Sequence, residues 1–464
     1  MAVNLNQTLR WKAANADESA MLTDLQGSIL KNHGREHTLN IFLRFNSAAG
    51  ARQWIKTAVV PAIPNQLQQL KDAEHHKQDS AFSGPTFVEL LLSRAGYDAL
   101  NIPAPKRPTD ARWAAGMQAS LGPNGDPTVA TWDAHLKAPH AMLLIGGVKR
   151  AEATAMRAHL KNAMGAAVTI LGSETGKAIK NKQGHGLEHF GYVDGRSLPL
   201  MLTEDVENER DSEGGINLWD PAFTLQTALV RDPGGQGQNS HGSFFVFRKL
   251  EQNVKAFKAA EEQLALDLGL SGDDAERAGA MIVGRFEDGT PVVLHPDAQL
   301  NHPVWNNFNY DADPQGARCP FQGHIRKTNP RGGTGSSGPA LLSERAHIMA
   351  RRGITYGKRL ASLKDQPETG VGLLFQAFMR DISNQFEFTQ QSWANNDGFI
   401  QGGTGPDLVI GQPNNHNAPQ QWPVAYGNPA SKQPATVRRD LARFVTMKGG
   451  EYLFAPAIST LASL

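Results

Sequence analysis

The chain alternates short apolar runs with longer stretches of helix-like spacing. Runs rich in β-branched and aromatic residues, bounded by polar residues, predict strands over 38–45, 86–92, 141–145 and 168–171. Apolar residues spaced three and four apart predict helices over 48–60, after the first strand, and over 150–163, between the third and fourth. This first part of the chain therefore reads as an α+β unit.

A second unit of the same kind follows a segment dense in turn formers. We expect the seam between the units at Gly214-Gly215 and residues 232–240, which run Asp-Pro-Gly-Gly-Gln-Gly-Gln-Asn-Ser. Beyond the seam the pattern predicts strands over 243–247 and 371–378 and helices over 249–268 and 381–393. The outline repeats without a residue-level repeat, so we expect two α+β domains, over 1–213 and 214–464.

Composition narrows the class of protein without naming it. A chain of 464 residues exceeds the usual size of one hydrophobic core and can bury a large cofactor. Lys and Arg number 46 against 45 Asp and Glu, so the net charge of +1 gives no electrostatic case for nucleic acid or an anionic membrane. No apolar run approaches the roughly 18 residues that span a bilayer.

Cys319 is the only cysteine, which excludes an internal disulfide and a multi-cysteine metal site. The first residues carry no basic and apolar leader, and a single thiol suits a reducing compartment. We therefore expect a cytoplasmic location, with a secretion signal removed beforehand as the alternative.

Fifteen histidines are scattered without paired-ligand spacing, so context must separate them. Residues 318–331, Arg-Cys-Pro-Phe-Gln-Gly-His-Ile-Arg-Lys-Thr-Asn-Pro-Arg, place His324 among several cationic residues. A haem needs such a mixture, because a neutral imidazole binds the iron and Arg or Lys pairs with the propionates. The alternative is a buried histidine that caps a loop.

A second segment, residues 190–197, reads Phe-Gly-Tyr-Val-Asp-Gly-Arg-Ser. It sets the Asp194 carboxylate between Gly191 and Gly195, where the backbone can turn sharply and approach a flat ligand closely. The alternative is an ordinary Asp-Gly turn whose carboxylate faces solvent.

These two segments, together with Arg351-Arg352-Gly353-Ile354, resemble the dye-decolourising peroxidase family. The family carries a Gly-x-x-Asp-Gly motif, then His-Ile-Arg-Lys-x-Asn-Pro-Arg, then Arg-Arg-Gly-Ile, and all three occur here in that order. The likeness extends over nearly the whole chain, through residues 24–31, 242–248, 284–291 and 449–454. Thr355 stands where the family commonly has proline.

The resemblance implies two ferredoxin-like domains with antiparallel sheets and peripheral helices, and one haem b held non-covalently between them. The absence of Cys-x-x-Cys-His agrees with non-covalent attachment. By position, His324 is the iron ligand, Asp194 lies on the distal side, and Arg351 is the distal arginine, with Arg352 as the weaker alternative. The other residues expected at the cofactor are Gly195, Arg196, Ser197, Arg326, Arg331, Leu373, Phe375 and Asp381.

The implied activity is that of a haem peroxidase, which reduces hydrogen peroxide and oxidises dyes, phenolics or similar organic donors. Asp194 would shuttle the proton between the peroxide oxygens, and Arg351 would stabilise the charge on the departing oxygen. The alternative is that the positioned arginine, together with a water, supports cleavage by itself. Leu373 and Phe375 are expected to line the distal pocket.

Asp381 is our candidate partner for the proximal imidazole, although capping of its own helix explains that residue equally well. An oligomer is possible. A haem carrier or iron-release protein with incidental peroxidase activity is the rival function, and a haem-free ferredoxin-like protein is a third reading. The distal carboxylate with an arginine favours the enzyme.

Overall fold

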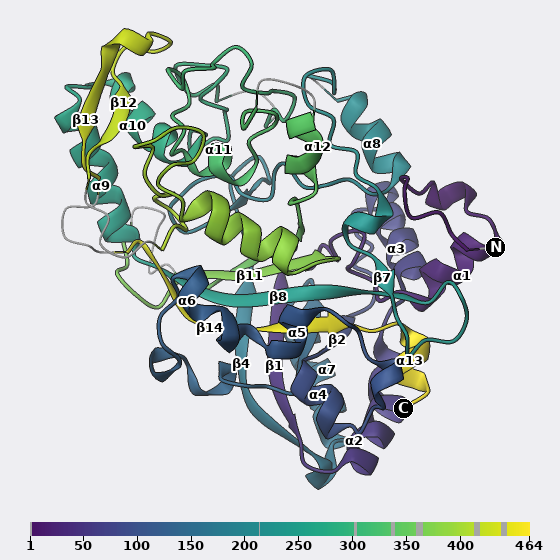
Figure 1. The fold of residues 1–464 in the computed structure, drawn as a ribbon. Helices are drawn as coiled ribbons and strands as arrows, with labels where there is room; N and C mark the ends of the chain where they lie inside the picture. Colours follow the sequence, from purple (N-terminus) through teal and green to yellow (C-terminus); the bar gives the residue numbers. More distant parts are fainter. Residues whose placement is uncertain are drawn as a thin grey trace.

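The computed structural model describes residues 2–212, 214–300, 304–335, 339–358, 365–412, 418–437 and 443–464. Its centre is a closed barrel of antiparallel strands, in which β8, β14, β2, β3, β1, β4, β10 and β11 follow one another and β11 returns to pair with β8. Helices surround the barrel, with α2, α4, α5 and α7 around its lower part and α9 to α12 gathered above it in Figure 1. The α+β expectation is therefore confirmed.

The first half of the barrel comes from residues before the expected seam. Its strands pair in the order β2-β3-β1-β4, and they are β1 (His37–Phe45), β2 (Phe87–Leu92), β3 (Ala141–Gly147) and β4 (Val168–Lys177). All four coincide with predicted strands, and β4 runs further than expected because it pairs with β1 along its length. The predicted helices are α2 (Ala48–Trp54), continued by a π-helical turn at Ile55–Val59, and α7 (Arg150–Asn162).

The second half uses β8 (His241–Gln252), β10 (Ile354–Tyr356), β11 (Gly372–Met379) and β14 (Val445–Ala455), in the order β14-β8-β11-β10. The predicted helix over 249–268 begins later, as α9 (Val254–Asp267), because β8 stays paired with β11 as far as Glu251 and with β14 as far as Gln252. The helix predicted over 381–393 forms as two π-helical segments, Ser383–Glu387 and Thr389–Ala394.

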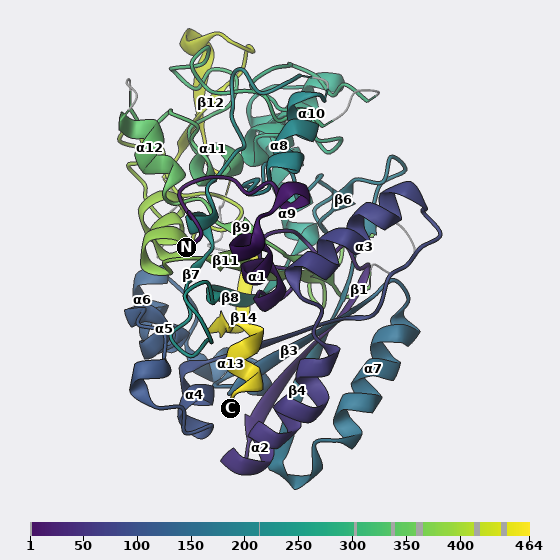
Figure 2. The same cartoon turned by 90° about the vertical axis from the view of Figure 1, so that its right-hand side faces the viewer.

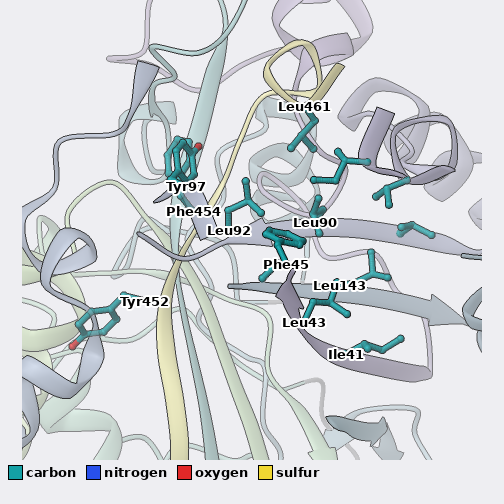
Figure 3. Packing of buried hydrophobic residues seen from close by; sticks show 14 of the residues in the cluster. Ile41, Leu43, Phe45, Leu90, Leu92, Tyr97, Leu143, Tyr452, Phe454 and Leu461 are labelled. Carbon is teal, nitrogen blue, oxygen red and sulfur yellow. The ribbon is translucent and has the colours of Figure 1, made fainter. Parts of the chain in front are cut away.

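The two halves are joined by two short strand pairings and share a hydrophobic core. Phe454 pairs with Leu92 to join β14 to β2, and Tyr356 pairs with Gly176 to join β10 to β4. One hydrophobic cluster takes Ile41 and Leu143 from the first half and Tyr452 from the second, and Figure 3 shows these side chains with Phe454. Apolar residues from both halves are therefore buried together.

The remaining elements cover the barrel and build the region above it, as Figure 2 shows from a second side. The helices are α1 (Ala16–Asp24), α3 (Gln66–Gln78), α4 (Arg94–Ala99), α5 (Ala111–Ala115), α6 (Leu121–Asn124), α8 (Thr203–Arg210), α10 (Asp273–Val283), α11 (His324–Thr328), α12 (Pro339–Arg345) and α13 (Ile458–Ala462). The short strands are β5 (Ile179–Lys180), β6 (Gly186–Leu187), β7 (Val230–Arg231), β9 (Ala350–Arg351), β12 (Gln420–Pro423) and β13 (Lys432–Ala435). Over the described residues, every helix is too short or too polar to cross a membrane.

Candidate active site

A cavity of about 330 Å³ lies where α11, β8, β11 and two loops converge. Its size falls within the range of small-molecule and cofactor pockets. The predicted site residues that line it are His324, Asp194, Gly195, Arg196, Ser197, Arg351, Leu373 and Phe375. The three sequence motifs, far apart along the chain, thus contribute to one space.

His324 is the first residue of α11, and a buried carboxylate fixes its ring. Nδ1 donates a hydrogen bond of 2.7 Å to Oδ2 of Asp407, whose side chain has no exposed surface. Burial by itself lowers the pKa of His324, but the charge and hydrogen bond of Asp407 outweigh it and raise the pKa. With Nδ1 engaged, Nε2 is the ring nitrogen left to offer a lone pair to a ligand.

Asp407 is held ionised by the groups around it. Burial alone raises the pKa of its carboxyl, but His324 and the backbone N–H groups of Ile410 and Val409 outweigh burial and lower the pKa. Both amides donate to Oδ1, at 3.1 and 2.7 Å. An ionised acceptor at this position orients the imidazole and increases its basicity, as the outer partners of ligating histidines do.

The prediction that Asp381 is the partner of the imidazole is wrong. Oδ1 of Asp381 accepts a hydrogen bond of 2.9 Å from the backbone N–H of Asn384, so the carboxylate caps the start of the helical segment. Asp381 does not line the cavity. Asp407 lies 83 residues after His324, and sequence reasoning missed it because no local pattern marks a contact at that separation.

Asp194, on the loop after β6, and Arg351, at the end of β9, both line the cavity and lie close to each other. Nη1 of Arg351 lies 3.8 Å from Oδ1 of Asp194, and each side chain is more than a third exposed, at 37% and 39%. Nη2 of Arg351 donates to the carbonyl of Arg196. The separation is an ion pair without a tight hydrogen bond, so both groups can still bind a small polar molecule.

The geometry distinguishes the tandem arginines. Arg352 lines the cavity, but its guanidinium turns away and donates to the carbonyls of Ser28 and Ile29. Arg351 is therefore the arginine that faces Asp194.

Backbone conformation shapes the loop that carries Asp194. Gly195 has φ +79° and a Cβ built there would meet nothing within 4 Å, so the missing side chain leaves open space at the cavity wall. Ser197 also lies in the left-handed region, at φ +66°, and its Oγ donates to Oδ1 of Asn306 at 2.6 Å while accepting from Arg331.

Arg326 and Arg331 do not line the cavity, contrary to the prediction that both contact the cofactor. Arg326 is fully buried, pairs with Asp313 at 2.9 Å, and stacks between the rings of Tyr310 and Phe321. Arg331 donates to the carbonyls of Asn306 and Phe308. Both guanidinium groups are engaged by nearby protein groups, because a buried guanidinium must find hydrogen-bond acceptors close to it.

Arg285 is a cavity arginine that sequence reasoning missed, although its segment belongs to the resemblance. Nη1 donates to the carbonyls of Gly289 and Trp305, at 2.7 and 2.8 Å, and Nη2 reaches Oγ of Ser197 at 3.4 Å. Burial lowers the pKa of Arg285 to about 10, so the group stays cationic at neutral pH. Arg196 also lines the cavity, but its guanidinium pairs with Glu209 at 2.7 Å.

Known proteins place these features in one family. A family model described as the DyP dimeric α+β barrel domain matches residues 24–178. The multifunctional dye peroxidase DyP2 from an Amycolatopsis species is 44% identical, over 100% of this chain and 100% of that protein. The chain belongs to the dye-decolourising peroxidase family. As a member it is a haem peroxidase, an oxidoreductase with hydrogen peroxide as acceptor.

Solved structures agree with this assignment to the dye-decolourising peroxidases. The structure of DyP2 from Amycolatopsis has a TM-score of 0.94 at 43% identity, and a DyP-type peroxidase from Anabaena has a TM-score of 0.93 at 37% identity, each over 100% of both chains. A dye-decolorizing peroxidase of the fungus Auricularia auricula-judae is 29% identical over 94% of this chain and 86% of its own. The barrel is therefore the fold of the family.

The residues at the cavity of this dye-decolourising peroxidase suit a haem. An imidazole anchored through Nδ1 is the donor that haem iron takes from a histidine. Gly195 leaves room beside it for a flat group, and Arg285 and Arg351 offer cationic donors for carboxylates.

Proposed function

We propose that this peroxidase binds one haem b per chain without a covalent bond, in the cavity between its two halves, and oxidises dyes, phenolics or similar organic donors at the expense of hydrogen peroxide. One observation carries the proposal, namely that an anchored imidazole, a carboxylate and an arginine line the same cavity. A haem carrier needs only an axial ligand and an apolar slot, so the pair of Asp194 and Arg351 favours the enzyme.

Each half of the barrel is proposed to be one ferredoxin-like domain, over 1–213 and 214–464. The strand orders support this division, because both halves place their first strand between their third and their last. The first half runs β4-β1-β3-β2 and the second runs β14-β8-β11-β10. The cofactor would then lie between two domains of the same design, a common place for ligand sites.

His324 is proposed to hold the iron through Nε2. When bound, haem supplies an open coordination position for peroxide and the electrons that its reduction requires. The Nδ1–H donated to Asp407 fixes the tautomer and gives the ring anionic character, which stabilises higher oxidation states of a metal bound to Nε2.

Asp194 and Arg351 are proposed to divide the work on peroxide. A carboxylate oxygen of Asp194 takes the proton from the first peroxide oxygen and returns it to the second, so that water leaves. Arg351 supplies the positive charge, and its guanidinium stabilises the negative charge that grows on the departing oxygen. The 3.8 Å between the two groups puts both within reach of one small molecule.

The remaining contacts to the cofactor are assigned by position. Arg285, beside Ser197, is proposed to meet a carboxylate of the cofactor, while Arg331 supports Ser197 from behind. Leu373 and Phe375 occupy alternate positions on β11 and both line the cavity, so they are proposed to limit its distal part to peroxide-sized molecules.

We further propose that the protein acts without nucleic acid or membrane, in keeping with its net charge of +1, and that it is able to form an oligomer.

The test begins with the purified chain and hemin. We expect a Soret band that survives gel filtration, a change in that band when hydrogen peroxide is added, and peroxide-dependent bleaching of an anthraquinone dye. Acid-acetone should extract the haem, since no covalent bond is proposed. Haem uptake without any response to peroxide would overturn the enzyme, and an unchanged Soret band in His324→Ala would overturn the ligand.

A further inference from the structure

Glu89 is a carboxylate buried in the apolar wall of the barrel, and it does not line the cavity. It lies on β2, has no exposed surface, and shares its face of the strand with Phe87 and Leu91, both members of one hydrophobic cluster. Ser28 donates from Oγ to Oε2 at 2.7 Å, while Oε1 is buried and has no hydrogen-bond partner among the described residues. A charge held by one hydrogen bond is costly, so this carboxylate needs another explanation.

Arg352 supplies a charge of the opposite sign one residue away. Its guanidinium is buried and donates to the carbonyls of Ser28 and Ile29, at 2.8 and 2.9 Å. Its third acceptor is the carbonyl of Arg351, at 2.8 Å. All three acceptors are uncharged, and the same Ser28 that accepts from Arg352 through its carbonyl donates to Glu89 through its hydroxyl. Both buried charged side chains therefore hydrogen-bond to the same residue, Ser28.

The segment between the two charges is fixed in place. Gln26 donates from Nε2 to the carbonyl of Leu90 and accepts from the N–H of Leu90, both at 2.9 Å. These bonds tie the segment to β2 directly beside Glu89. A shift of the Arg352 side chain therefore cannot be absorbed by movement of Ser28, and it must instead be taken up on the side of Arg351.

We propose that Glu89, acting through Ser28 and Arg352, is a positioning residue that holds the backbone of Arg351 where its side chain faces Asp194. This rests on the proposed role of Arg351 in peroxide reduction. The carboxylate keeps the Arg352 guanidinium docked on the carbonyls of Ser28 and Ile29, and Arg352 in turn clamps the Arg351 carbonyl. Arg352 also donates its backbone N–H to Gln376 on β11, so both sides of the Arg351–Arg352 peptide are held.

The charged groups around Glu89 are few. β2 and its neighbour β3 carry no other titratable side chain, and the other neighbour, β14, pairs with β2 only at Phe454 and Leu92. Arg352 acts on Glu89 from the β9–β10 connection, and the charges of Arg352 and Arg35 both act on His33. Burial lowers the pKa of His33 to about 3, so that ring is neutral over the working range. Asp205, which pairs with Lys31, is the other carboxylate that acts on Arg352.

The rate of the peroxide reaction should therefore depend on the protonation of Glu89. Burial raises its pKa to about 7, against the opposing effects of Ser28 and Arg352. Below that pH the carboxyl takes up a proton, Arg352 loses its charge partner, and the hold on Arg351 weakens. We expect the wild-type rate constant for hydrogen peroxide to fall as pH drops through about 7, and we expect that step to vanish in Glu89→Gln.

The experiment uses haem-loaded wild type, Glu89→Gln and Ser28→Ala, mixed rapidly with hydrogen peroxide at pH 8. Both variants should react roughly ten- to a hundredfold more slowly, since a displacement of about 1 Å remote from the chemistry can cost that much. Glu451→Gln is the matched control. Glu451 is buried on β14 with a pKa also raised to about 7 by burial, but it accepts from the backbone of Met117 and Tyr452. Its rate should equal that of wild type.

A crystal structure of Glu89→Gln gives a readout independent of activity, and it should show Arg351 withdrawn from Asp194. Wild-type rates across the pH range with Arg351 in place would overturn the inference. If Arg351→Leu slows the reaction while Glu89→Gln and Ser28→Ala do not, only the inference fails. If Arg351→Leu itself reacts at the wild-type rate, the proposed role of Arg351 fails and the inference with it.

Discussion

Replacing Asp407 by Asn is the sharpest test of how the iron ligand is prepared. The change keeps the size of the side chain and removes the charge that His324 contacts at 2.7 Å. Burial lowers the pKa of His324, and in the native protein the charge and hydrogen bond of Asp407 are the main effects that oppose burial and raise the pKa. In the variant burial acts without its main opponent, so the pKa of His324 should drop from above its ordinary value to below it.

The magnitude follows from the kind of bond that is lost. A hydrogen bond to a charged group contributes about 1.5–3 kcal/mol, and loss of the outer partner of a ligating histidine typically costs roughly ten- to a hundredfold in metal affinity. We therefore expect Asp407→Asn to release haem roughly ten to a hundred times faster, measured as transfer to an excess of a haem-scavenging apoprotein. The pKa itself is read from the His324 ring resonances of the apoprotein by NMR.

The same pair makes the stability of the apoprotein depend on pH in a defined sense. The raised pKa of His324 contributes stability that is present at low pH and lost as pH rises through the raised value. The lowered pKa of Asp407 contributes stability that is present above roughly 4 and lost as pH falls through the lowered value. Urea unfolding should therefore show the largest difference between wild type and Asp407→Asn in mild acid.

Asp381→Asn is the control, because it is the same chemical change in a carboxylate that caps a helical segment outside the cavity. It should leave haem release and the His324 pKa as in wild type. A raised His324 pKa in Asp407→Asn, or equal haem release from both variants, would refute the reasoning.

Three further substitutions test the other assignments. Asp194→Asn should slow the reaction with hydrogen peroxide by roughly 10²- to 10⁴-fold in stopped flow while leaving the resting haem spectrum nearly unchanged, since it removes only the proton carrier; an unchanged rate would contradict that role. Arg351→Leu should slow the same step by roughly 10²- to 10³-fold without changing haem content, because it removes charge stabilisation. Arg326→Ala should lower the free energy of unfolding by about 3–5 kcal/mol in urea titration, because it leaves the buried Asp313 without its charged partner; a loss of peroxide reactivity with stability intact would instead place Arg326 at the cofactor.

Much of the barrel could be predicted from the sequence because its strands are buried, continuous apolar runs. β1, β2 and β3 have nearly every side chain buried, and their predicted ranges differ from the observed ones by at most two residues at each end. β14 was not predicted, since Gly449 and Gly450 interrupt its apolar run and its register shifts between Met447 and Gly449. The late start of α9 likewise depended on the partners of β8, which lie more than a hundred residues away in the chain.

The candidate site divides in the same way. His324, Asp194 and Arg351 lie in motifs that could be identified locally, and the structure brings them to one cavity. What the motifs could not convey is which cations of the His324 segment stay free for a ligand. Nothing in the sequence shows that Arg326 and Arg331 are engaged by other groups. In the fold, Arg326 pairs with the buried carboxylate of Asp313, and Arg331 donates to the carbonyl of Asn306. Asp407 is the opposite case. No motif marks it in the sequence, and only the fold brings its carboxylate to the His324 ring.

β14 is the last strand in the sequence, and its place in the barrel affects how the protein is made. Val445 and Met447 on this strand line the cavity, and β14 fills the position between β8 and β2. On the ribosome, β8 and β11 emerge long before their final neighbour, so β8 waits with one edge unpaired and prone to association. A premature stop before residue 445 would leave that edge open and the cavity without one wall. We therefore expect only a chain that has been synthesised through β14 to retain its cofactor.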